Sequence, residues 1–116
     1  MDKLKVGDKV YRTSSLGFTN FTQYQFSEVI RLTNTQAVLK NGVRLVNEPR
    51  MGFTDSIGFS EHGQRFAMWY PQNDEILQEA KAEAMKVKIY NWFFKRKFTE
   101  EEKAIIYKTF ESLNKL

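Results

Sequence analysis

The spacing of apolar residues changes near residue 71 of this 116-residue chain, and this change limits the possible folds more than any other feature. Before it, apolar and polar residues alternate over short stretches, which predicts β-strands with one buried face. After it, apolar residues recur three and four positions apart, which predicts amphipathic helices. Because a chain of this length supports one hydrophobic core, we expect one α+β domain with a β-rich part, residues 1–71, and a helical part, residues 72–116.

Five stretches of the β-rich part have the pattern of strands. They are residues 9–13, 23–33, 36–40, 43–46 and 65–70. Asn41-Gly42, between the third and fourth stretches, favours a two-residue hairpin turn. In the second stretch, Phe26 lies on the face that we expect to be buried. Strands joined by tight turns form an antiparallel meander, so we predict a strongly bent, five-stranded antiparallel barrel.

The helical part contains two predicted helices with a short connection between them. The first covers residues 73–95, with Asn73 or Asp74 as its N-cap. The second begins at Thr99, and Glu102 three residues later completes a capping-box pattern. We expect the helices to form a hairpin that packs against the barrel. The predicted core draws on both parts, and its members are Val10, Phe26, Val38, Leu39, Leu45, Ile76, Val87, Phe94, Ile106 and Phe110.

The opening of the chain carries a family resemblance. Residues 6–11 have the sequence Val-Gly-Asp-Lys-Val-Tyr, and a strand–turn–strand around Asn41-Gly42 follows. This arrangement resembles the first strands of SH3-like small barrels of the KOW and Tudor kind. Over roughly the first 50 residues, the chain also resembles small bacteriophage and mobile-element proteins that carry a helical tail. The resemblance implies an SH3-like barrel and a viral or accessory setting, and it implies no activity.

The residue types that most enzymes need are scarce. The absence of cysteine excludes disulfides, thiolate metal sites and a cysteine nucleophile, and His62 is the single histidine. No catalytic or nucleotide-binding fingerprint is present, so we expect a protein that is not an enzyme and uses no cofactor or metal. The remaining catalytic candidates share one Gly-rich loop, for which a solvated turn is the favoured interpretation: Asp55, Ser56, Glu61 and His62.

Charge supports a leading functional hypothesis. The chain has 18 Lys and Arg against 14 Asp and Glu, a formal net charge of +4 that favours contact with polyanions. Basic residues alternate with aromatic ones along the predicted strands, as in proteins that bind single strands by phosphate contacts and base stacking. We therefore predict nucleic-acid binding, to DNA or RNA, through one sheet face that carries Arg12, Arg31, Lys40, Arg44, Arg50, Arg65, Phe53 and Trp69.

The alternative is a protein-interaction module, in the form of a phage-type accessory protein that binds and modulates a host protein. Met85, Ile89 and Trp92 form a second apolar stripe on the first predicted helix, opposite its core stripe. Either the second helix covers this stripe, or a partner protein or a second copy does. A homodimer through the helices is thus one version of this alternative.

Three Gly-Phe pairs in predicted loops add a further question. They are Gly17-Phe18, Gly52-Phe53 and Gly58-Phe59. Their rings either cover the ends of the barrel or reach a partner from loop tips. Loops above a small barrel can also form a pocket for a small molecule, and the sequence does not rank this third possibility.

The first residues are charged and contain no apolar signal core, so we expect no secretory signal and a cytoplasmic protein. No stretch approaches the roughly 18 apolar residues that a spanning helix requires. We therefore expect no membrane partner.

Overall fold

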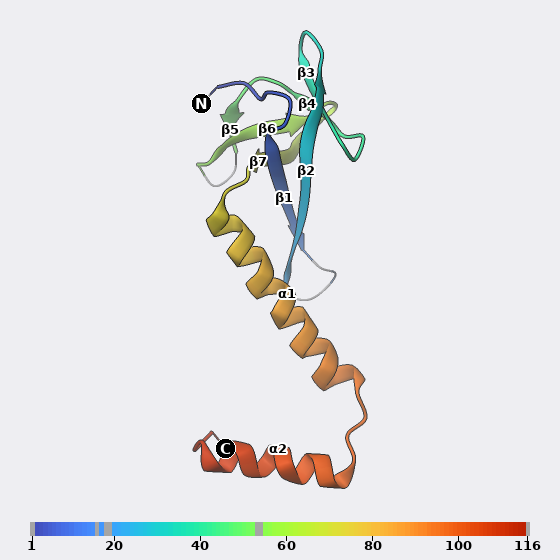
Figure 1. Ribbon diagram of the computed structural model, residues 1–116, viewed down its shortest axis with the longest axis vertical. Helices are drawn as coiled ribbons and strands as arrows, with labels where there is room; N and C mark the ends of the chain where they lie inside the picture. Colours follow the sequence, from blue (N-terminus) through green and yellow to red (C-terminus); the bar gives the residue numbers. More distant parts are fainter. Residues whose placement is uncertain (1, 16, 18–19, 53–54, 116) are drawn as a thin grey trace. The chain divides into compact units, whose positions relative to one another are not determined.

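The computed structural model describes residues 2–15, 17, 20–52 and 55–115. The chain divides into two compact units, Met1–Ala84 and Met85–Leu116. The boundary falls inside the first helix, α1 (Asp74–Lys95), and not at the change from strand to helix. The first unit therefore holds the sheet and the start of α1, and the second holds the end of α1 together with α2 (Glu100–Ser112) (Figure 1).

The described residues of the first unit form seven strands, each antiparallel to its neighbours. They are β1 (Lys9–Ser15), β2 (Thr22–Leu32), β3 (Gln36–Leu39), β4 (Arg44–Val46), β5 (Arg50–Met51), β6 (Ile57–Glu61) and β7 (Gln64–Pro71). The order β4-β3-β2-β1-β7-β6 closes on itself because β4 also pairs with β6. β5 pairs with β6 outside this ring. The result is a closed antiparallel barrel of six strands, which is compatible with an SH3-like barrel, and the two helices make the fold α+β.

Strands β5 and β6 are the difference from the five strands that we predicted. β6 contains Gly58 and Phe59, a pair expected in a loop. A Cβ atom at Gly58 would lie 2.7 Å from a ring atom of Tyr70 and 2.6 Å from the carbonyl oxygen of Trp69. This glycine therefore makes room for the neighbouring strand β7 and forms no turn. Phe59 is fully buried, so its ring belongs to the core.

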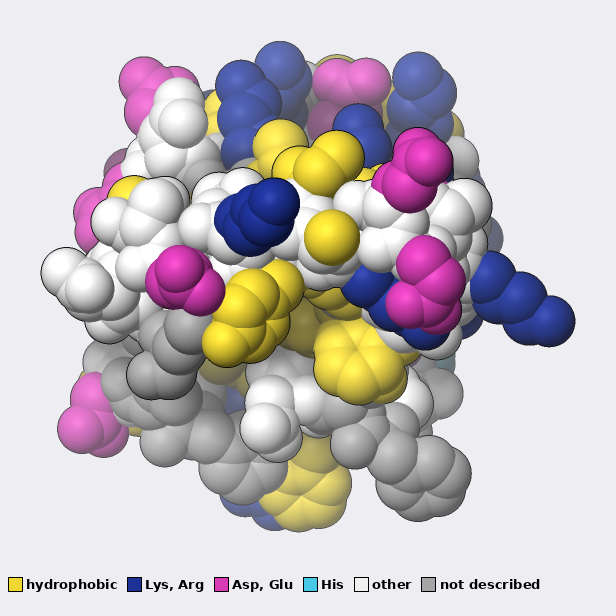
Figure 2. Space-filling view, turned by 90° about the horizontal axis from the view of Figure 1, so that it is seen from below, with side chains coloured by type: hydrophobic (Ala, Val, Ile, Leu, Met, Phe, Trp, Pro, Cys, Tyr) yellow, Lys and Arg dark blue, Asp and Glu magenta, His cyan; other side chains and the backbone are white. Residues whose placement is uncertain are grey.

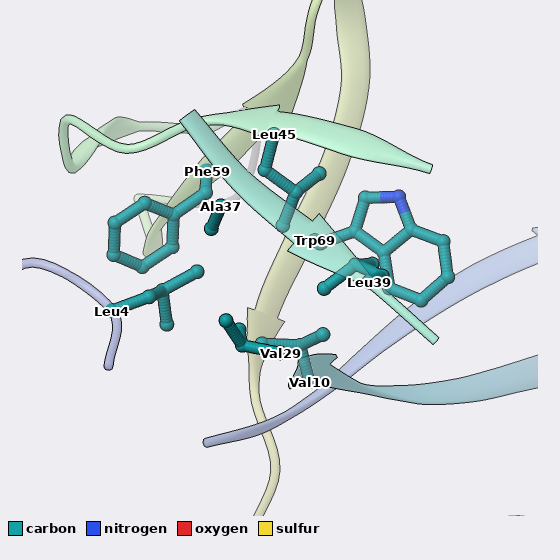
Figure 3. Packing of buried hydrophobic residues seen from close by; sticks show 8 residues of the cluster. All are labelled: Leu4, Val10, Val29, Ala37, Leu39, Leu45, Phe59 and Trp69. Atoms are coloured by element: carbon teal, nitrogen blue, oxygen red, sulfur yellow. The ribbon is translucent and has the colours of Figure 1, made fainter. Parts of the chain in front are cut away.

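The hydrophobic core lies inside the barrel (Figure 3). Its cluster consists of Leu4, Val10, Val29, Ala37, Leu39, Leu45, Phe59 and Trp69. The predicted strand residues that are confirmed as buried are Val10, Val38, Leu39 and Leu45. The prediction for Phe26 is wrong, because its side chain is 39% exposed. Phe26 lies opposite Tyr11 on the outer face of the β1–β2 pair, and Val29 of the same strand faces the core.

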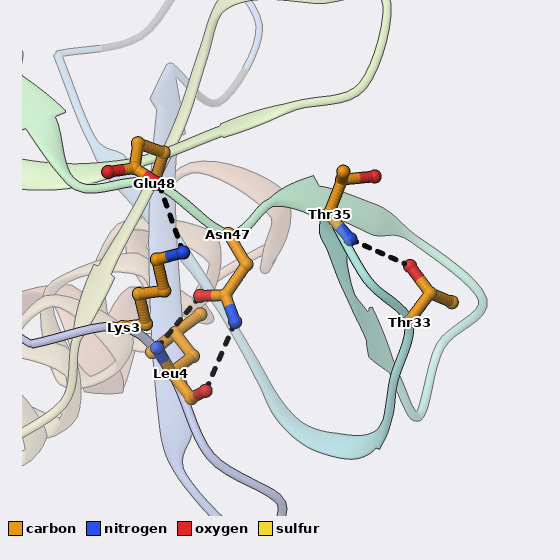
Figure 4. Close-up of polar contacts among 6 residues, drawn as sticks. All are labelled: Lys3, Leu4, Thr33, Thr35, Asn47 and Glu48. Carbon is orange, nitrogen blue, oxygen red and sulfur yellow. Dashed lines mark hydrogen bonds and ion pairs between the residues drawn. The ribbon is translucent and has the colours of Figure 1, made fainter.

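The segment before β1 is fixed to the barrel through Leu4. The Leu4 amide donates to Asn47 Oδ1 (2.8 Å), and Asn47 Nδ2 donates to the Leu4 carbonyl oxygen (3.2 Å) (Figure 4). Lys3 Nζ also lies 3.4 Å from Glu48 Oε2. Because Leu4 and Asn47 are both buried, these two hydrogen bonds satisfy polar groups that water does not reach.

The predicted helix starts are confirmed. Asn73 Oδ1 accepts a hydrogen bond from the Ile76 amide (2.8 Å) at the start of α1. At the start of α2, the Thr99 hydroxyl accepts from the Glu102 amide (3.1 Å), and the Glu102 carboxylate accepts from the Thr99 amide (3.0 Å). Both halves of the capping box are thus present.

The helical part of the predicted core is wrong. No described residue of α1 or α2 is buried. The five helical core candidates are partly buried or exposed: Ile76, Val87, Ile106, Phe94 and Phe110. The barrel encloses its own core, so the apolar stripes of the helices are not needed to complete it.

Within the second unit, α2 leaves α1 at a corner and does not fold back along it (Figure 1). The corner is held by aromatic contacts: the Phe98 ring lies 4.9 Å from the Trp92 ring and 6.0 Å from the Phe93 ring, between centroids. The Arg96 guanidinium lies 5.4 Å from the Trp92 ring centroid and pairs with Glu102. These contacts connect the helix ends, whereas the predicted hairpin requires contact along their lengths.

Candidate functional site

The predicted basic and aromatic residues do not form one face. Arg12 is half-buried, and its Nη1 atom lies 3.4 Å from Glu61 Oε1. The same carboxylate oxygen accepts a hydrogen bond from Trp69 Nε1 (2.9 Å). Trp69 itself is fully buried in the barrel, so the prediction that its ring is presented for stacking is wrong. Arg12 and Trp69 belong to an internal polar contact of the barrel wall.

Arg31 and Arg44 do lie together. Both are cross-strand partners of Val38, Arg31 from β2 and Arg44 from β4. Cross-strand partners share a face of the sheet, so the two arginines flank Val38. Lys40 follows β3 two residues after Val38 and is exposed. We call Arg31, Lys40 and Arg44 the basic trio.

Arg50 and Arg65 form a separate group at β5 and β7. Arg50 Nη2 donates to the Arg65 carbonyl oxygen (3.2 Å). The two arginines line a hollow of about 220 Å³ together with Phe66, whose side chain is 70% exposed. Phe66 was not among the predicted site residues; in β7 it directly precedes the buried residues Ala67, Met68 and Trp69. The remaining predicted ring, Phe53, lies outside the described residues.

An aromatic band, on β1, β2 and β7, is bordered by carboxylates; its members are Tyr11, Tyr24, Phe26 and Tyr70. The Tyr11 ring lies within 5.9–6.4 Å of the rings of Tyr24, Phe26 and Tyr70, between centroids. The Tyr24 hydroxyl lies 3.4 Å from Glu79 Oε2 on α1. Burial and then the charge of Glu79 raise the pKa of both Tyr11 and Tyr24. The first turns of α1 thus give this aromatic band an acidic border.

The second unit presents the other predicted surface. Met85, Ile89 and Trp92 are 55%, 49% and 44% exposed, so α2 does not cover them. Other exposed apolar side chains of this unit are Tyr90, Phe93, Phe94, Ile105, Tyr107, Phe110 and Leu113. For one face of the whole molecule, without regard to unit, Figure 2 shows hydrophobic side chains between charged ones. Trp92 also holds the corner, which gives it a structural role in addition to its exposure.

The net charge of the chain resides in this second unit. Residues 85–116 contain eight of the 18 Lys and Arg residues and four of the 14 Asp and Glu residues. Residues 1–84 therefore contain ten of each and are neutral. The charge that favoured a basic sheet face is thus carried by the helical unit.

The acid–base candidates are not assembled. Asp55 and Ser56 precede β6, whereas Glu61 and His62 lie at its other end. Glu61 is engaged by Trp69 and Arg12. Among the described residues, no group of three or more His, Asp or Glu side chains is placed to hold a metal ion. The helices in the described part of the chain are not long and apolar enough to cross a membrane.

Comparison with known proteins found no matching family model, no matching curated protein and no matching solved structure. The surfaces described above are therefore the basis for a functional proposal.

Proposed function

We propose that this chain is a non-enzymatic binding protein that docks onto an acidic partner protein through its helical unit, residues 85–116. The observation that carries the proposal is the uncovered stripe of Met85 and Ile89 on α1. Side chains four positions apart lie on the same helix face. Such a pair is the usual anchor of a helix that binds in a groove.

The chemistry of the partner follows from charge. The helical unit carries the whole +4 net charge, and Lys86 and Lys88 alternate with the apolar residues of α1. A groove with an apolar floor and acidic rims complements this combination of side chains. The accessory setting implied by the resemblance to phage proteins fits a partner that is a host protein.

The test compares two apolar truncations. After capture and purification of a partner, the Met85→Ala/Ile89→Ala variant should bind it about tenfold or more weakly, because the anchors are lost. Ile30→Ala is the matched control, since Ile30 is 52% exposed in the first unit. Higher salt should weaken the wild-type complex. Equal affinity of both variants contradicts the proposal. A wild-type dimer that only the double variant disrupts assigns the stripe to a second copy instead.

A second candidate function is nucleic-acid binding by the basic trio. The specific observation in its favour is the placement of Arg31 and Arg44 on both sides of Val38. Replacing both arginines by Gln should weaken binding to a single strand. It should also reduce the slope of log K against log [salt] by the amount that corresponds to about two phosphate contacts. Replacing Arg50 and Arg65 by Gln is the control, because they lie in another group. A folded Arg31→Gln/Arg44→Gln protein with unchanged binding contradicts this function.

A further inference from the structure

A hollow of about 510 Å³ opens on the outer face of the barrel in the first unit. Its walls include Lys9, Phe26, Glu28, Lys40, Asn41 and Leu77. We call this hollow the Phe26 groove. Its volume falls within the roughly 300–1,000 Å³ of pockets that hold small molecules.

Backbone pairing brings the groove residues together from distant parts of the sequence. Lys9 and Glu28 are cross-strand partners, and Phe26 lies two residues before Glu28 on the same face. The Lys40 amide donates to the Glu28 carbonyl oxygen (2.9 Å), which holds the β3–β4 turn beside β2. The Gln72 amide donates to the Lys9 carbonyl oxygen (3.0 Å), and this bond directs the chain into α1, where Leu77 lies. The groove is thus fixed by the barrel and by the first turn of α1.

The groove combines an apolar wall with two free cations. Phe26 and Leu77 supply the apolar wall, and Phe26 is the exposed ring that the core does not use. Neither Lys9 nor Lys40 forms an ion pair with a described carboxylate. Glu28 is the one carboxylate in the wall, so the net charge of the lining is +1.

We propose that the Phe26 groove binds a small planar organic anion. The flat apolar body of the ligand lies against Phe26 and Leu77, and its carboxylate, phosphate or sulfonate group lies beside Lys9 and Lys40. The aromatic quadrupole favours such stacked or edge contacts, and two ammonium groups at the rim favour the anionic end. Glu28 disfavours ligands that carry a second negative charge on its side of the groove. This site is independent of the helical unit and of the proposed partner.

The experiment is an NMR titration of the ¹⁵N-labelled full chain with two probes of the same shape. The anion 2-naphthalenesulfonate should give saturable amide shifts around Lys9, Phe26 and Lys40. The neutral 2-naphthol should bind the same amides several-fold more weakly, because it lacks the charge. Equal affinity for the two probes, or shifts of the anion confined to residues 85–116, overturns the proposal.

Two charge-removing variants locate the site. Lys40→Gln should weaken binding of 2-naphthalenesulfonate about fivefold, as expected for one partly exposed charge contact. Lys81→Gln is the control, since Lys81 is exposed on α1 and does not line the groove. Both variants should keep the wild-type amide pattern away from the substitution, which shows that they fold. Equal affinities of the two variants overturn the proposal, as does binding of a single-stranded oligonucleotide with no response to the small anion.

Discussion

The two units of this chain differ in whether they bury their apolar side chains. The first encloses eight side chains in a closed barrel and is electrically neutral. The second has no buried residue among those described, exposes most of its large apolar side chains and carries the whole net charge. Closure of the barrel leaves its six strands without a free edge. The second unit gains its stability from local contacts, which leaves its surface available for binding.

The largest expected effect separates two phenylalanines. Phe59→Ala should lower the free energy of unfolding of the barrel by about 3–5 kcal/mol, because Phe59 is fully buried and its loss leaves a cavity. Phe94→Ala should change it by less than about 0.5 kcal/mol, because Phe94 is 74% exposed. Urea unfolding followed by Trp69 fluorescence, in a Trp92→Phe background, measures both. Similar losses for the two variants would mean that the second unit contributes to the core.

Local sequence signals predicted the elements of both units better than their packing. The capping box of Thr99 and Glu102 is confirmed because its four groups lie within four residues. The buried face of β2 was not predictable from alternation, because both of its faces carry apolar side chains: Phe26 lies on the outer face and Val29 faces the core. The sequence did not predict β6, because Gly58 indicated a loop. In the structure, Gly58 makes room for the Tyr70 ring of the neighbouring strand β7.

The candidate sites were harder to predict than the fold. Alternation placed Arg31 and Arg44 on a sheet surface, but only the pairing of both with Val38 shows that they are neighbours. Helical spacing identified Met85 and Ile89 as a second stripe, and it contained no information on whether α2 covers that stripe. The residues of the Phe26 groove come from several strands and from the first turn of α1, so no local sequence pattern predicts the groove.

A smaller effect tests whether the N-terminal segment belongs to the stable unit. Asn47→Ala should lower the free energy of unfolding by about 1–3 kcal/mol, because the buried amide and carbonyl groups of Leu4 lose their partner. Asn34→Ala is the control, since Asn34 is exposed in a turn. Hydrogen exchange at the Leu4 amide should accelerate in the first variant only. Unchanged stability and exchange would show that the segment contributes nothing to the barrel.

The smallest effect concerns the second unit alone. The pKa of Glu102 is lowered from its usual 4.5, first by the hydrogen bond from the Thr99 amide and then by the one from Arg96. A lowered pKa in the folded state means that the carboxylate stabilises the capping box above pH 4.5, and that this contribution is lost as the pH falls through the folded-state pKa. The helix signal in circular dichroism should therefore decrease on acidification below about pH 4.5.

Glu102→Gln isolates this contribution. Glutamine retains the hydrogen bond to the Thr99 amide without titrating, so the variant should lose part of the acid transition. Glu101→Gln, on the same helical turn, should keep the wild-type transition. The barrel core contains no residue of the second unit. The urea midpoint of the barrel, reported by Trp69 fluorescence, should therefore be the same for the wild type and for Glu102→Gln. A barrel midpoint that shifts with Glu102→Gln would contradict the separation of the two units, since a local cap would then support a core that it does not contact.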